Sequence, residues 1–391
     1  MPAGPTLEQL LAAKEIVVSC GSGGVGKTTT AAAAAAMSAA HLGAKTLVLT
    51  VDPARRLADA LGLEALGNVE HRVPAEAFKA AGVEPRGELW AAMLDIKRSW
   101  DELVLRHAPD RSTADRILTN RLYQNVSGKF VQSYEYIAME RLYEVHSAGR
   151  YDLIVVDTPP SRSAVDFLAA PDRMADFFAS RLLRWLTAPS RSKLLNMASR
   201  PFYQVADRLL GSQFLGDIAE FFQLFQSMYD GFAARAEAVK RLLHDRRTTF
   251  LVVTTLEAAP LREAEAFLTQ LKADGFHPGA LVLNKVLPEY LRIPELAAVA
   301  ERLAADAPKL AAALGEEAGS PPAAVARVLR EVALSYLNFS VVAKREAEAR
   351  AELASVPDVV ATVPYFDEDV TDLTGLLKLG RSIWGQPVHL G

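Results

Sequence analysis

Short runs of apolar, largely β-branched residues recur along this chain of 391 residues, separated by longer stretches with helical patterns. Each run has the length of a strand and ends near a glycine, a proline or a polar residue. Seven runs are predicted as strands: 15–19, 45–51, 88–95, 151–157, 248–254, 280–284 and 359–363. Because apolar residues fill these runs instead of alternating with polar ones, helices are expected to cover both faces of the sheet. The pattern predicts an α/β fold with a doubly wound, mostly parallel sheet.

Two intervals between the predicted strands, 97–150 and 164–247, are too long for a simple crossover and have helical patterns. We interpret them as helical insertions that form a helical subdomain within a single domain spanning residues 1–391. In the second interval, apolar residues recur at helical steps of three and four: Ile218, Phe221, Phe222, Phe225, Tyr229 and Phe232. This stripe fits either the core of the insertion, the commoner reason for such a pattern, or a groove that binds an apolar client.

Further helices are predicted over 295–314, 322–354 and 373–384. The last has two basic residues and two glycines, so it is a weak membrane anchor and is interpreted as a terminal packing helix.

Composition narrows the classes of function. The net charge is −4, with 23% charged residues, so no general basic excess points to nucleic acid as a partner. Cys20 is the only cysteine, which excludes an internal disulfide and a CxxC zinc site. The start of the sequence lacks the pattern of a signal peptide. We therefore expect a cytoplasmic protein, and the scattered histidines are expected to be structural.

The segment CGSGGVGKTTTAA, residues 20–32, has the pattern of a phosphate-binding P-loop. A predicted strand precedes it and an alanine-rich helix is predicted over 27–42, which is the context such a loop needs. Lys27 is expected to reach the β- and γ-phosphates of ATP, and the Thr28 hydroxyl to bind Mg²⁺. The residues expected to bind the nucleotide are Gly21, Ser22, Gly23, Gly24, Val25, Gly26, Lys27, Thr28 and Thr29.

Carboxylates end two of the predicted strands. Asp157 is in the Walker B arrangement and is expected to hold Mg²⁺ directly or through water. Asp52 precedes Pro53, so it is a candidate to orient the attacking water, to cap a helix, or to do both. Arginines that follow these carboxylates are candidates for stabilising transition-state charge, although surface ion pairs are an equal alternative: Arg55, Arg56 and Arg162.

Four stretches, in order, resemble the ArsA-like ATPases: GSGGVGKTTTA, TVDPARRLADALG, IVVDTPPSRSAVDFL and LVLNKV. This family includes the arsenite-pump ATPase and the ATPase that targets tail-anchored membrane proteins, and it is related to MinD and ParA. The resemblance covers most of the chain and implies a P-loop NTPase fold, ATP and Mg²⁺ as cofactors, and a dimer. In targeting members, the helical subdomain pairs across the dimer and forms an apolar groove for the client.

The resemblance also implies roles for individual residues. It places 52–57 in switch I, with Asp52 positioning water, and 157–163 in switch II. It places adenine beside Asn284 and the segment 363–366, which includes Pro364 and Tyr365.

Three features depart from the family pattern. Ser22 stands where members carry a lysine that reaches the neighbouring subunit's phosphates, and both the CxxC staple and the arsenite-sensing cysteine triad are absent. Loss of a comparable cation costs about 10³–10⁵ in rate. Either an arginine of this chain replaces it, or a paralogous partner supplies the lysine in a heterodimer, or hydrolysis is slow and the protein is a nucleotide-gated clamp.

We expect a cytoplasmic, Mg²⁺-dependent ATPase whose nucleotide state gates a dimer and an apolar helical surface, for protein targeting or chaperoning. Its partner would be a hydrophobic client or a membrane protein, and no nucleic acid is expected. The alternatives are the ATPase subunit of an anion transporter, a positioning protein of the MinD/ParA type, and a non-hydrolysing ATP-dependent scaffold.

Overall fold

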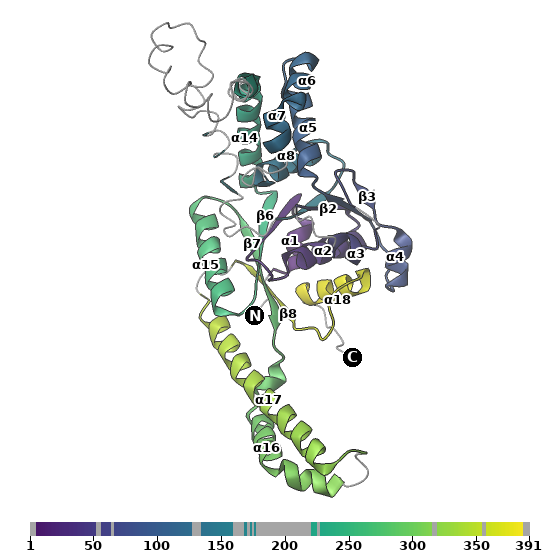
Figure 1. Ribbon diagram of the computed structural model, residues 1–391, viewed down its shortest axis with the longest axis vertical. Coiled ribbons are helices and arrows are strands. Elements are labelled where there is room, and N and C mark those ends of the chain that lie inside the picture. The colour runs from purple at the N-terminus through teal and green to yellow at the C-terminus, as the bar shows by residue number, and fades with distance from the viewer. Residues whose placement is uncertain are drawn as a thin grey trace, which may run out of the picture.

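The computed structural model describes residues 5–51, 56–63, 66–126, 134–158, 168–169, 173, 176, 220–224, 227–314, 319–353 and 357–385. Its centre is an eight-stranded sheet in the order β3-β4-β2-β5-β1-β6-β7-β8 (Figure 1). The strands are β1 Ile16–Cys20, β2 Lys45–Thr50, β3 His71–Arg72, β4 Glu88–Met93, β5 Leu153–Asp157, β6 Thr248–Thr254, β7 Pro278–Val286 and β8 Val359–Pro364. All neighbouring pairs are parallel except β3 and β4. The predicted doubly wound, mostly parallel sheet is confirmed.

Strand β3 is absent from the sequence prediction. It has only two residues, both exposed, and it pairs antiparallel with β4 at the edge of the sheet. Arg72 at its end forms a 2.9 Å ion pair with Glu88 of β4. A strand this short and polar has no apolar pattern, so only the tertiary pairing defines it.

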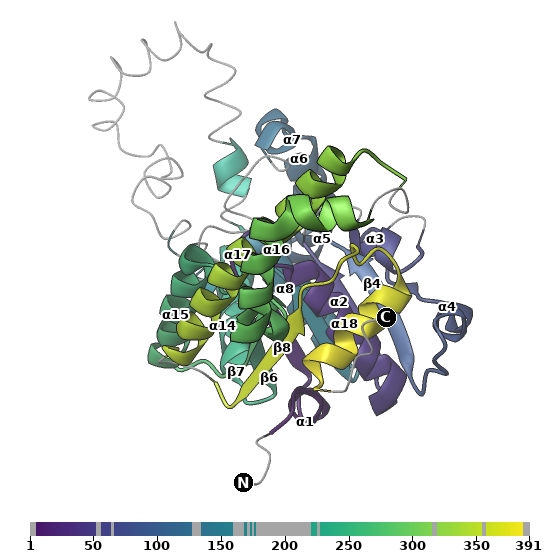
Figure 2. The ribbon, with the colours of Figure 1, turned by 90° about the horizontal axis from the view of Figure 1, so that it is seen from below.

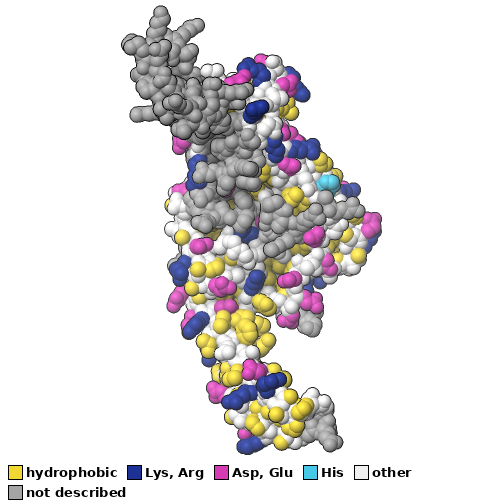
Figure 3. All heavy atoms as spheres, viewed as in Figure 1, with side chains coloured by type: hydrophobic (Ala, Val, Ile, Leu, Met, Phe, Trp, Pro, Cys, Tyr) yellow, Lys and Arg dark blue, Asp and Glu magenta, His cyan; other side chains and the backbone are white. Residues whose placement is uncertain are grey.

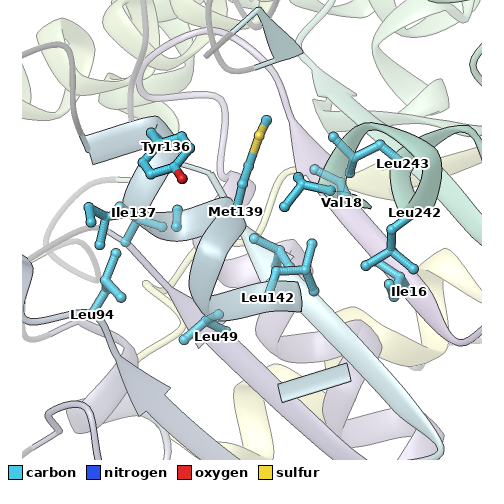
Figure 4. Close-up of a cluster of buried hydrophobic side chains, with 14 of the residues drawn as sticks. Ile16, Val18, Leu49, Leu94, Tyr136, Ile137, Met139, Leu142, Leu242 and Leu243 are labelled. Atoms are coloured by element: carbon cyan, nitrogen blue, oxygen red, sulfur yellow. The ribbon is translucent and has the colours of Figure 1, made fainter. Parts of the chain in front are cut away.

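Helices cover both faces of the sheet, as the apolar runs predict. Along β1, Ile16 and Val18 belong to one buried cluster and Val17 belongs to the other. On the first face, strand residues pack against α8 (Tyr134–Ser147) and α14 (Tyr229–His244), as Figure 4 shows for Leu142 and Leu242. Helix α15 (Ala258–Ala273) also packs on this face. The alternation of side chains along each strand thus builds two separate cores.

The second face is covered mainly by α2 (Lys27–Met37) and α18 (Leu373–Ile383), with α1 (Leu7–Ala12), α3 (Arg56–Ala60) and α4 (Ala75–Ala80) around them. The predicted helix 27–42 is α-helical only to Met37 and continues as a π-helix, Ser38–Leu42. Helix α18 lies across α2 (Figure 2) and approaches it closely, since a Cβ at Gly380 would lie 2.2 Å from Met37 Cγ. The last helix therefore packs in the core, as predicted.

The parts of the two predicted insertions that the structure describes are helical. They include α5 (Ile96–His107), α6 (Arg111–Thr119), α7 (Arg121–Val126), α8 and α14, which lie together at one end of the molecule in Figure 1. Within this group, Phe232 is 1% exposed and lies against Trp100 and Tyr136, with ring centroids 6.3 and 6.0 Å away. Phe221 is also buried and lies 6.5 Å from Tyr123.

These two members of the apolar stripe pack in the core of the helical group, which favours the core interpretation over a client groove for them. Phe222 is partly buried against the same cluster. Ile218, Phe225 and the side chain of Tyr229 lie outside the described residues.

At the opposite end of the molecule, α16 (Pro294–Leu314) and α17 (Pro322–Ala351) form a long hairpin that projects from the sheet (Figure 1). These bounds match the predicted helices 295–314 and 322–354 closely. Across the part of the chain that the structure describes, we find no helix that is both long enough and apolar enough to cross a membrane.

Candidate nucleotide-binding site

At two positions the loop between β1 and α2 combines a positive φ with a close neighbour, so that only glycine fits there. Gly26 is the N-cap of α2 with φ 96°, and a Cβ there would lie 2.3 Å from Asn284 Nδ2. Gly21 has φ 152°, and a Cβ there would lie 2.1 Å from the carbonyl oxygen of Val253. The loop is therefore pressed against β6 and β7 while it leads into the N-terminus of an eleven-residue helix. Such a helix end concentrates backbone N–H groups and positive potential for an anion.

Lys27, the first residue of α2, lies along this loop. Its side chain is buried, and its ammonium group donates a 2.9 Å hydrogen bond to the carbonyl of Ser22. The contact closes the loop on itself and holds a cation at its rim. A buried ammonium beside backbone N–H groups is the arrangement that binds the phosphates of a nucleotide.

Asp157 is brought next to Thr28 by the strand order. Strand β5 lies between β1 and β2, with Asp157 opposite Ser19 on one side and Thr50 on the other. Its Oδ2 accepts hydrogen bonds from the Thr28 hydroxyl at 2.7 Å and from the Thr50 hydroxyl at 2.9 Å. The carboxylate is fully buried. A carboxylate and a hydroxyl at hydrogen-bond distance form the oxygen ligand set that Mg²⁺ prefers, so the residues present fit this ion.

A second layer of hydrogen bonds fixes these groups. The hydroxyl of Thr158 donates to the carbonyl of Ser19 at 2.8 Å, which ties the end of β5 to β1. Thr50 and Thr158 were not predicted as site residues. Both are polar residues at the ends of apolar runs, and this is the signal that would have indicated them.

Asn284 contacts the P-loop directly. Its Nδ2 donates a 2.7 Å hydrogen bond to the carbonyl of Val25, and its Oδ1 accepts one from the backbone N–H of Lys285 at 2.9 Å. Lys285 has φ 58°, where the register between β7 and β8 shifts. After this shift, the backbone N–H of Tyr365 donates to Val286, and the Tyr365 side chain stays exposed.

The edge that carries the P-loop therefore also carries Asn284, Pro364 and Tyr365. The roles of these three residues in holding adenine stay predictions.

Ser22 donates a hydrogen bond through its hydroxyl to Glu263 of α15. Glu263 was not predicted as part of the site, and a glutamate on an amphipathic helix gives no sequence signal for this contact. Ser22, which stands where the resembled family has a lysine, is thus neutral and bonded to a carboxylate, so its side chain adds no positive charge to that of Lys27. Any cation besides Lys27 that acts on the γ-phosphate has to come from another residue.

Several predicted site residues lie outside the described residues: Asp52, Arg55 and Arg162. Arg56 begins α3, and Thr29 lies in the first turn of α2. Whether an arginine replaces the missing lysine therefore stays a prediction.

Cys20 ends β1 directly before the loop and is buried. Burial raises the pKa of its thiol to about 12, although Lys27 acts in the opposite direction. The thiol is therefore protonated at neutral pH and unreactive.

Comparison with known proteins agrees with this geometry. Residues 14–304 match the model of a family described as anion-transporting ATPase. The match ends within α16, so α17 lies outside it.

Curated relatives include a putative arsenical pump-driving ATPase of Chlorobaculum tepidum, 26% identical over 282 residues, which are 70% of this chain and 61% of that protein. An uncharacterized protein of Streptomyces coelicolor is 31% identical over 274 residues, which are 69% of this chain and 62% of that protein. The ATPase GET3 of Malassezia globosa is 26% identical over 300 residues, which are 72% of this chain and 76% of that protein. The chain thus spans about 61% of the length of the first of these relatives.

Proposed function

The chain belongs to the family of anion-transporting ATPases, and we propose that it binds and hydrolyses ATP with Mg²⁺ at the P-loop. The observation that carries this proposal is the contact of Asp157 with Thr28 at the first turn of α2. It joins the end of β5 to the loop that follows β1, and a buried hydrogen bond from Thr50 also holds the carboxylate of Asp157. The proposed unit is a single ATPase domain over residues 1–391, with helical insertions at 97–150 and 164–247.

Each residue of the site has a distinct task in this proposal. The backbone N–H groups of the loop and the N-terminus of α2 bind the phosphates, and the ammonium of Lys27 binds the β- and γ-phosphates. Thr28 and Asp157 hold the metal ion, and Mg²⁺ neutralises charge on the phosphate oxygens when bound. Asp52 positions the attacking water.

Ser22 stands in place of a lysine, so the mechanism needs another residue to supply positive charge at the γ-phosphate. Because Ser22 is bonded to Glu263, it supplies none. We propose that Arg55 or Arg162 of this chain, or a lysine of a paralogous partner, stabilises charge on the γ-phosphate. The first case predicts an active homodimer and the second an active heterodimer. Without either, hydrolysis is slow and the protein acts as an ATP-dependent scaffold.

We propose that the nucleotide state gates a dimer and an apolar helical surface, in the cytoplasm, for the targeting or chaperoning of a hydrophobic client. The name of the relative ATPase GET3 supports an ATPase of this type. A second candidate is the ATPase subunit of an anion transporter, which the family description and the arsenical pump-driving relatives favour. With one buried cysteine, such an anion would not be bound through thiolates.

Substitution of Lys27 tests the proposal. Lys27→Ala should abolish tight binding of a fluorescent ATP analogue, and phosphate release should fall to the background of the assay. The matched control is Lys378→Ala, on α18, where the lysine lies over the ring of Phe366. Both measurements are repeated with EDTA in place of Mg²⁺, which should stop hydrolysis by the wild type. Full turnover by Lys27→Ala, or turnover that does not depend on Mg²⁺, would remove the P-loop from the mechanism.

A further inference from the structure

The α16–α17 hairpin carries most of the large apolar side chains that are exposed within the described residues. It follows β7, so it leaves the sheet at the edge where β1 leads into the P-loop. Figure 3 shows apolar side chains over this projection, with charged side chains of both signs among them. Exposed apolar residues in such number on one element mark an interaction surface.

The two helices meet through small residues. The buried residues of α16 are Ala300, Ala307 and Ala311, and those of α17 are Ala333, Ser340 and Ala343. These side chains recur at helical steps and face the other helix. Because small residues fill the contact between the helices, the larger apolar residues beside them are left at the surface.

Leu334 and Val341 lie on the opposite side of α17, and the other large exposed residues form one stripe on each helix. Steps of three, four and seven residues separate them, which is the spacing of a and d positions in a coiled coil. We define the hairpin face as Leu296, Val299, Leu303 and Leu310 of α16 with Val325, Val328, Val332, Phe339 and Val342 of α17. Seven of these nine are 39–58% exposed, all except Leu303 and Val325.

Both stripes lie on the same side of the hairpin. Val299, Leu310, Val332, Phe339 and Val342 each come one residue before a buried residue of the contact between the helices. One residue turns a helix by about 100°, so each stripe is rotated by that angle from the contact. Because the helices run antiparallel (Figure 1), the same rotation on each carries both stripes to one face.

The hairpin is fixed to the sheet at its base. The carboxylate of Glu346 accepts a 3.0 Å hydrogen bond from the backbone N–H of Leu287, and the Tyr336 hydroxyl donates to the carbonyl of Tyr290 at 2.9 Å. The end of α17 packs on the first core through Ala349 and Leu353. Leu287 follows Asn284 by three residues, so the hairpin is connected closely to the P-loop.

The size of the hairpin face suits a dimer. Its exposed side chains offer roughly 600 Å² of apolar surface, at the upper end for the largest patch of a monomer. Two such faces together bury about 1,200 Å², which reaches the range of specific protein interfaces.

The charges beside the stripes have both signs, such as Arg302, Lys309 and Glu331. Asp306 lies between the apolar residues of α16 and pairs with Lys309 at 3.1 Å. An apolar membrane segment offers no partners for these groups, and an anionic lipid surface repels Asp306 and Glu331, whereas an identical hairpin offers the same stripes and the opposite charges.

We propose that two copies of this chain associate through the hairpin face, with their α16–α17 hairpins packed as a four-helix bundle. The inference names the contact surface for the dimer of the proposed function and rests on it. Since the bundle needs no metal, it can hold a dimer without a pair of cysteines.

The first test is the mass of the purified full chain by light scattering over a concentration series, with and without ATP. The double variant Val332→Glu/Phe339→Glu should raise the dimer dissociation constant at least ~100-fold, since it places like charges at the centre of the contact. Leu334→Glu is the matched control, because Leu334 is exposed on the same helix but points away from the hairpin face. It should dimerise as the wild type does.

A second measurement tests the geometry without weakening the contact. Ser335→Cys puts a thiol within the stripe of α17, and the native Cys20 is buried and unreactive. A bismaleimide should link two copies through Cys at this position, while Arg330→Cys, on the opposite side of α17, should give little product. Equal linkage of the two variants would contradict the proposed face.

Binding of the ATP analogue, measured on the same samples, separates the two proposals. A wild type that binds ATP but stays monomeric, or a double variant that dimerises as tightly as wild type, overturns the hairpin interface and leaves the ATPase proposal intact. A monomer whose hairpin face instead binds an apolar helical peptide also overturns it. A dimer through the hairpin that does not bind ATP would refute the proposed function alone.

Discussion

Replacement of Gly26 by alanine tests how the P-loop is held against β7. A Cβ at this position would lie 2.3 Å from Asn284 Nδ2, and the backbone has φ 96°. The left-handed backbone costs a non-glycine residue about 1–2 kcal/mol. Relief of the overlap requires Asn284 to move, which breaks its 2.7 Å hydrogen bond to Val25 and costs a further ~1–1.5 kcal/mol. The expected loss for Gly26→Ala is therefore about 2–3.5 kcal/mol of unfolding free energy.

A double-mutant cycle separates the two causes. Asn284→Ala alone should cost ~1–3 kcal/mol, because the buried carbonyl of Val25 loses its donor. In the double variant, Asn284→Ala leaves no side-chain amide to overlap with the Cβ of residue 26. The hydrogen bond to Val25 is then counted once, whereas the sum of the two single variants counts it twice. The destabilisation of the double variant should therefore be about 1–1.5 kcal/mol smaller than the sum of the single variants.

The assay is urea unfolding followed by circular dichroism, with free energies obtained by linear extrapolation. Gly23→Ala is the matched control, because a Cβ at Gly23 meets no atom within 4 Å. It should change stability by no more than ~0.5 kcal/mol. If Gly26→Ala is as mild as Gly23→Ala, or if the effects of Gly26→Ala and Asn284→Ala simply add, then the described contact does not hold the loop.

Two further predictions concern the helical group and the turn between α14 and β6. Phe232→Ala should destabilise the protein by ~3–5 kcal/mol, because Phe232 is buried against Trp100 and Tyr136; a loss below ~1 kcal/mol in the same urea assay would mean that the residue is at a surface. Hydrogen bonds from Arg247 lower the pKa of Asp245 to about 2 in the folded protein. The ionised carboxylate therefore stabilises the fold above its unfolded pKa of ~4, and this stabilisation is lost as the pH falls from ~4 towards 2. Arg247→Gln should flatten the pH dependence of unfolding between these values, and an unchanged profile would contradict the assignment.

Local patterns predicted the elements of the sheet because their causes are local. The predicted runs at 15–19, 151–157 and 248–254 are mostly apolar, and the structure buries every residue of β1, β5 and β6, including the polar ones near their ends. Glycines and a lysine at fixed spacing define the P-loop, because the loop needs glycine to adopt its backbone and to approach its neighbours. Its shape could therefore be predicted from thirteen consecutive residues.

The pairings within the candidate site could not be predicted in this way, because they join distant segments. Thr50 reaches Asp157 only because β5 lies next to β2 in the sheet, although more than a hundred residues separate them. The contacts of Asn284 with Val25 and of Glu263 with Ser22 likewise depend on strand order and helix placement. Asn284 was expected at this site from its place at the end of a strand, but its contact with Val25 was not, and a glutamate on an amphipathic helix carries no pattern that indicates Ser22 as its neighbour.

The hairpin shows most clearly what the sequence determined and what the tertiary structure decided. Segments rich in Ala, Leu, Glu and Arg, which favour helices, were sufficient to predict two long helices at 295–314 and 322–354. By hydrophobicity alone, Val332 and Phe339 would be expected in the contact between them, with Ala333 and Ser340 outside. The structure buries the small residues and exposes the large ones. A sequence fixes which residues share one face of a helix, but which face is buried depends on what packs against it, and only the fold determines that.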